Sequence, residues 1–112
     1  MALPANISTG TVTGTFLNVA GGAKSGTVTF RPSFDHALDA GANVVFVPEK
    51  VTASLDTYGS FSVVLAATND PDLLPLNFTY TVEINIYGSS IPSFTMSLLA
   101  GTTVDLTDVM PL

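Results

Sequence analysis

The chain has 112 residues, of which 46% are apolar and only 11% are charged, so we expect one small domain. Nine acidic and three basic residues give a net charge of −6. This balance argues against nucleic-acid binding and against docking on an anionic membrane, because both need clustered Lys and Arg. The absence of Cys excludes disulfides and thiol chemistry, and the single histidine, His36, excludes sites that need two imidazoles.

An uncharged stretch, residues 84–104, is about as long as a bilayer span. Gly88, Pro92 and Gly101 interrupt it, so we predict no transmembrane helix. Residues 1–6 lack the basic segment and the apolar core of a signal peptide. We therefore expect a protein that is made and kept outside the secretory route.

The first half of the chain is dominated by a period of two, which is typical of strands with one buried face. Residues 8–16 alternate Thr with Val12, Gly14 and Phe16, and residues 26–31 place Val28 and Phe30 inward. The Gly-rich residues 18–25 between these strands are interpreted as a hairpin loop.

Two less regular segments follow. Residues 33–41 contain the only local helical spacing in the chain, which is too short for a stable helix, so we predict a loop with at most one helical turn. Residues 44–47 are a short apolar strand that ends at Pro48.

The clearest turn signal is residues 56–59, which begin with Asp56 and end with Gly59. Val51, Ala53 and Leu55 alternate before this turn, and Phe61, Val63 and Leu65 alternate after it. We therefore predict that these two runs pair as an antiparallel hairpin.

Residues 67–77 are expected to form a loop, and three more strands follow it at residues 78–86, 94–98 and 104–106. The first of them has the longest alternation in the chain, with Phe78, Tyr80, Val82, Ile84 and Ile86 on one face. Seven or eight short strands without a helix predict an all-β fold, a single antiparallel β-sandwich spanning residues 1–112.

Two segments could carry chemistry. His36 has Asp35 beside it but no nucleophile motif around it, so we interpret it as a loop histidine rather than a catalytic base. Residues 69–72, Asn-Asp-Pro-Asp, offer oxygen ligands of the kind that Ca²⁺ prefers, but the same pattern forms Asx-turns, which we favour. No catalytic, cofactor or metal site is therefore predicted, and we expect no enzyme activity.

Two apolar segments are candidates for contact with other proteins. The apolar loop of residues 73–76 directly follows acidic residues, so it either closes the end of the sandwich or touches a partner. The apolar C-terminal residues 109–112 likewise either pack on their own domain or touch a partner. We accordingly propose residues 1–8 and 107–112 as docking arms. The candidate partner-contact residues are Leu73, Leu74, Leu76, Val109, Met110 and Leu112.

Five segments in order, residues 10–16, 26–32, 55–72, 78–82 and 104–111, resemble the small β-sandwich domains of virion proteins in tailed bacteriophages of actinobacteria. The central part also resembles prealbumin-like sandwiches, and an immunoglobulin-like arrangement is the other architecture expected. The resemblance implies a structural protein of the virion without cofactors. It would be a head decoration protein bound to the major capsid protein, or else a minor tail protein, and either could form homo-oligomers. The alternative is a carbohydrate-binding or adhesion module that uses Tyr58, Tyr87 and Asn85.

Overall fold

The computed structural model describes residues 6–39, 41, 43–47, 49–74 and 77–111, and its regular secondary structure is almost entirely β-strand. The longer strands are β1 (Thr9–Thr15), β2 (Gly26–Pro32), β6 (Ser60–Ala66) and β7 (Tyr80–Ile86). The shorter ones are β3 (Ala37–Asp39), β4 (Val44–Phe46), β5 (Val51–Ser54), β8 (Phe94–Met96) and β9 (Thr103–Asp105). A 3₁₀ turn, η1, covers Leu106–Asp108. Among the described residues, no helix is long and apolar enough to cross a bilayer.

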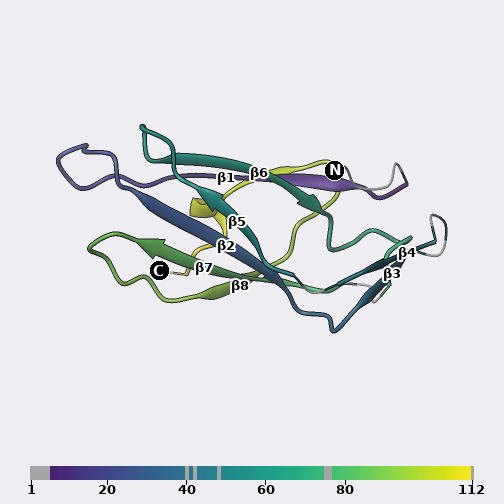
Figure 1. Cartoon of the computed structure of the whole chain (residues 1–112). Coiled ribbons are helices and arrows are strands. Elements are labelled where there is room, and N and C mark those ends of the chain that lie inside the picture. Colours follow the sequence, from purple (N-terminus) through teal and green to yellow (C-terminus); the bar gives the residue numbers. More distant parts are fainter. Residues whose placement is uncertain (1–5, 40, 42, 48, 75–76, 112) are drawn as a thin grey trace.

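Two sheets face each other as the layers of a sandwich (Figure 1). One sheet has the strand order β6-β1-β9, the other has the order β5-β2-β7-β8, and β3 and β4 form a separate ribbon at one end. The molecule is elongated, 49 Å by 22 Å by 22 Å. The all-β sandwich expected from the alternating pattern is confirmed.

The core lies between the sheets and is built from the alternating residues of the long strands. Val12 of β1 and Val28 and Phe30 of β2 are completely buried, as is Val82 of β7. The Phe30 ring packs on the Phe61 ring of the opposite sheet with 6.1 Å between centroids. Because every second side chain of a strand points to the same face, the sequence pattern predicts this core correctly.

The predicted hairpin of residues 51–65 is wrong, although its turn is present. Asp56 accepts hydrogen bonds from the backbone N–H groups of Tyr58 and Ser60, and Gly59 has a φ of +76°. However, β5 pairs with β2 and β6 pairs with β1, so the turn carries the chain from one sheet to the other. β1 offers β6 a longer partner than the four-residue β5 could, since β1 pairs along all seven residues of β6.

Residues 33–41 also differ from the expected loop with a helical turn. Ala37–Asp39 form strand β3, which pairs with β4 in an antiparallel ribbon. Ala37 and Asp39 are buried, and the Asn6 side-chain amide donates to an Asp39 oxygen at 2.7 Å. Tertiary packing thus overrides the weak helical spacing of this segment.

The last strand departs from a purely antiparallel arrangement. β9 lies parallel to β1, with Val104 opposite Val12, and it stops at Asp105 rather than continuing through Leu106. The Asp105 carboxylate accepts a hydrogen bond from the Thr107 backbone N–H, which caps η1 and lowers the pKa of that carboxyl group. A β-strand therefore ends where a side-chain cap starts a 3₁₀ turn.

Candidate functional site

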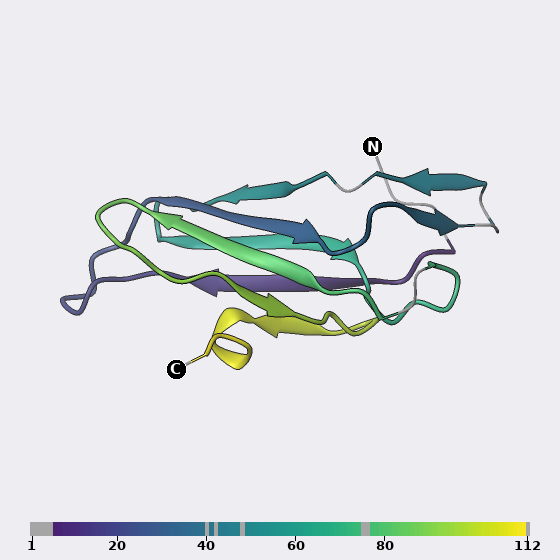
Figure 2. The same ribbon diagram turned by 90° about the horizontal axis from the view of Figure 1, so that it is seen from below.

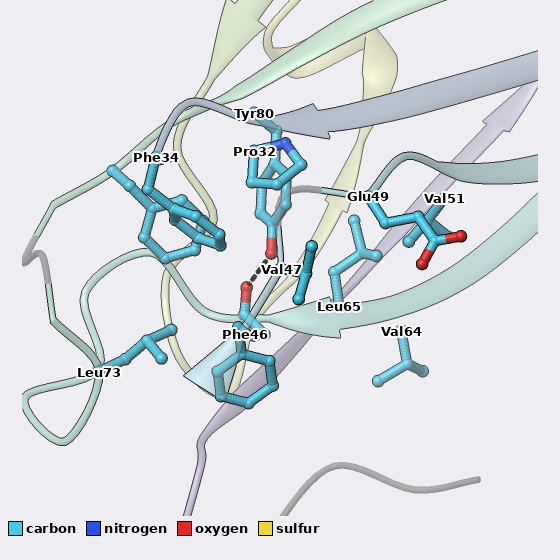
Figure 3. A pocket seen from close by; sticks show the side chains of 12 residues that line it. Pro32, Phe34, Phe46, Val47, Glu49, Val51, Val64, Leu65, Leu73 and Tyr80 are labelled. Atoms are coloured by element: carbon cyan, nitrogen blue, oxygen red, sulfur yellow. Dashed lines mark hydrogen bonds between the residues drawn. The ribbon is translucent and has the colours of Figure 1, made fainter. Parts of the chain in front are cut away.

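The candidate site is an apolar groove on the side of the sandwich where β5 and β6 are the edge strands of their sheets (Figure 3). Phe46, Val47, Glu49 and Val51 line one wall, and β6 forms the other. The volume of the groove is about 240 Å³. We call it the β5–β6 groove; its lining residues are Pro32, Phe34, Phe46, Val47, Glu49, Val51, Val64, Leu65, Ala66, Leu73, Phe78 and Tyr80.

Tyr80 forms the floor of the groove and ties the two sheets together. Its hydroxyl donates to the backbone carbonyl of Ala66 at 2.7 Å, across the gap from β7 to β6 (Figure 3). Burial raises the pKa of the Tyr80 hydroxyl, so this group stays protonated and remains a donor. Edge-to-face contacts from Tyr80 to Phe78 and from Phe78 to Phe34 extend the floor. The groove therefore has a rigid aromatic base.

The rim of the groove is rich in exposed apolar side chains. Val47 is 72% exposed, Val64 is 59% exposed and Val51 is 40% exposed. Glu49 is the charged residue of the lining. Apolar side chains that gather around an opening are typical of a protein contact surface rather than of a freely solvated one.

Sequence reasoning missed these rim residues, although a signal for them exists. Residues 44–47 are four consecutive apolar residues, and Val63 and Val64 are adjacent in β6. Because neighbouring side chains of a strand point to opposite faces, each run must expose at least one apolar side chain. For Tyr80 the sequence predicts only a place in the core, since its contact with Ala66 depends on tertiary structure.

The two leucines predicted to touch a partner divide between the interior and the surface. Leu73 is buried and lines the inner end of the groove, so it helps to close the end of the sandwich. Leu74 is 50% exposed, and its backbone exchanges two hydrogen bonds with Leu38, at 2.8 and 3.0 Å. Leu76 and Leu112 lie outside the described residues.

The C-terminal candidates lie on their own domain. The backbone N–H groups of Val109 and Met110 both donate to the carbonyl of Leu106, at 3.1 and 2.9 Å. Both side chains are partly buried against the core. At the other end of the chain, Ile7 is buried in the core, and residues 1–5 lie outside the described part.

The oxygens of the acidic loop bind backbone N–H groups. Asp70 is buried and accepts from the N–H of Asp72 at 2.8 Å, which is the expected Asx-turn, and also from the N–H of Ser8. Asn69 accepts from the N–H of Ala100 at 2.9 Å. These contacts hold the acidic loop against the residue before β1 and against the β8–β9 connection. In the described part of the chain, no group of three or more potential metal-ligating side chains is assembled.

The remaining candidates lie apart from the groove. His36 is exposed in a shallow hollow that it shares with Ser33 and Asp35. Asn85 and Tyr87 line another hollow of about 570 Å³ beside β7, and Tyr87 is 84% exposed. Tyr58 lies outside this hollow, at the turn between β5 and β6. Comparison of the chain with protein-family models, curated proteins and solved structures gives no match.

Proposed function

We propose that this protein is a non-enzymatic structural subunit that works by docking on other proteins through the β5–β6 groove. The observation that carries the proposal is the cluster of exposed valines around an apolar opening with a rigid floor. A subunit of a permanent assembly buries such surface, so its outer residues need few charges for solubility.

The assembly that we propose is the virion of a tailed bacteriophage, assembled in the host cytoplasm. The support for this step is the resemblance of five segments of the chain to small β-sandwich virion proteins. Within the virion we favour decoration of the outer surface of the head, on the major capsid protein, over a place in the tail.

The test is binding of the purified chain to purified phage particles that lack this protein. We expect the wild-type chain to co-sediment with the particles at a fixed stoichiometry. Val47→Asp and Val64→Asp should weaken binding by about tenfold or more, because each places a charge in an interface that is otherwise apolar. Leu99→Asp is the matched control, since Leu99 is 54% exposed and lies on the β8–β9 connection. A wild-type chain that stays in the supernatant would refute the virion assignment.

A second candidate function is glycan binding, which the hollow beside β7 favours. Tyr87 offers an exposed ring for stacking on a sugar, and Asn85 with Ser89 and Ser90 offers polar groups in the same hollow. We expect Tyr87→Ala to abolish binding to a glycan array, whereas Tyr58→Ala, outside the hollow, should leave it unchanged. An array without any signal for the wild-type chain would eliminate this function.

A further inference from the structure

The connection between β1 and β2 ends in a rigid tip, which we define as residues 17–23. The side-chain oxygen of Asn18 accepts from the backbone N–H groups of Ala20 and Gly22, both at 2.9 Å. The N–H of Asn18 donates to the carbonyl of Gly22 at 2.9 Å. Val19, at the centre of this network, is fully exposed at 110%. The tip thus holds an apolar side chain in water in a fixed geometry.

Such a tip is organised for docking. Because hydrogen bonds already fix the main chain of the tip, little further backbone freedom is lost when the tip binds. Leu17, at the base of the tip, is 54% exposed and enlarges the apolar surface. Gly21, with a φ of +89°, allows the tight return of the chain.

The β5–β6 groove is apolar like this tip and is large enough to admit its central side chain. A volume of about 240 Å³ accepts a single branched apolar side chain such as Val19, and the walls are mainly apolar. The tip lies at one end of the long axis, whereas β4, whose Phe46 lines the groove, lies toward the other end (Figures 1 and 2). A chain therefore cannot place its tip in its own groove, but it can reach the groove of another copy.

The charged residue of the groove lining and the charged residue that follows the tip are opposite in sign. Residues 17–23 carry no charge, and Lys24 follows them directly. Glu49 is the charged residue of the groove lining. Because the net charge of −6 makes copies repel each other at long range, an opposite-charge pair at the contact would set the orientation of approach.

We propose that the tip of one copy docks in the β5–β6 groove of a second copy, with Val19 in the groove and Lys24 beside Glu49. The inference rests on the proposed function of the groove and names a second copy of this chain as its occupant. Since two different surfaces meet, the contact is heterologous. It would produce a ring if the rotation from one copy to the next closes, and a filament if it does not.

The test is self-association measured by sedimentation velocity over a range of concentrations. We expect the wild-type chain to associate, and we expect Val19→Asp and Val47→Asp to remain monomeric at the same concentrations. An equimolar mixture of the two variants should form a dimer and nothing larger. In that mixture, the intact tip of Val47→Asp docks in the intact groove of Val19→Asp. The remaining tip and the remaining groove each carry a substitution, so no third chain can bind.

A control variant and a pair of charge-exchange variants test whether the association is specific. Leu99→Asp has the same charge change on another part of the surface and should associate like the wild type. Lys24→Glu alone and Glu49→Lys alone should each weaken association, and a mixture of these two variants should form the opposite-charge pair again. All the substituted side chains are exposed or partly exposed, and thermal unfolding of each variant verifies the fold.

The outcomes separate this inference from the proposed function. A wild-type chain that stays monomeric at every concentration, a Val19→Asp chain that associates normally, or a mixture that forms no dimer would each overturn self-docking. If Val47→Asp still weakens binding to particles in any of these cases, the groove binds another protein and only the inference fails. If the mixture forms dimers while Val47→Asp binds particles normally, self-docking stands and the proposed docking on the virion through the groove fails.

Discussion

Replacing Phe30 by Ala should lower the free energy of unfolding by about 3–5 kcal/mol, the usual cost of removing a buried phenylalanine ring. Phe30 is completely buried in β2, between β5 and β7. Its ring also contacts Phe61 of the other sheet, so its removal leaves a cavity where the two layers meet. Since small domains have about 5–15 kcal/mol of stability, this loss is a large fraction of the total.

The measurement is unfolding in denaturant, followed by far-UV circular dichroism. Phe30→Leu keeps much of the buried volume and should lose less than Phe30→Ala. Tyr58→Ala removes a ring that is 77% exposed and should change stability by less than about 0.5 kcal/mol. Equal stability of Phe30→Ala and the wild type would show that the two sheets do not depend on this contact.

Replacing Asp70 by Ala should cost about 3 kcal/mol, because hydrogen bonds to a charged group contribute about 1.5–3 kcal/mol each. The buried carboxylate accepts from the backbone N–H groups of Ser8 and Asp72. Ser8 is also held through its carbonyl, which accepts from the N–H of Ala67 at 2.9 Å. Loss of the carboxylate should therefore loosen the start of β1 as well as the loop.

Hydrogen exchange of the Ser8 amide measures how far the start of β1 is loosened, and unfolding in denaturant gives the change in the free energy of unfolding. Asp70→Asn retains one oxygen of the same shape and should have an intermediate effect. Asp72→Asn, at an exposed carboxyl group two residues later, is the matched control and should leave both quantities unchanged. Normal protection of the Ser8 amide in Asp70→Ala would contradict the role assigned to this side chain.

The sequence predicts the inward faces of the strands but not the partners of those strands. Val28, Phe30 and Val82 could be placed in the core because alternation is a local property. The pairing of β1 with β6, and of β2 with both β5 and β7, could not be predicted, because it depends on competition between segments far apart in the chain. A turn such as residues 56–59 has the same local signature whether it joins paired strands or crosses between sheets.

The candidate site could be predicted only in part. Leu73 and Leu74 are adjacent and equally apolar, and only the tertiary structure shows that one faces the core and the other faces solvent. The Asx-turn at Asp70 follows from local chemistry, but its second contact, with Ser8, joins residues 62 positions apart. The groove itself arises because two edge strands lie on the same side of the sandwich, a property of the topology rather than of any segment.

The parallel pairing of β1 with β9 has a consequence for how the chain folds. Val12 lies opposite Val104, so β1 gains one of its two neighbours only after β2 to β8 have been made. Domains dominated by such long-range pairing fold in roughly milliseconds to seconds, far more slowly than helical bundles. During synthesis on the ribosome, β1 and β6 would therefore have an open edge where β9 later pairs. Completion of the sheet would be one of the last steps of folding.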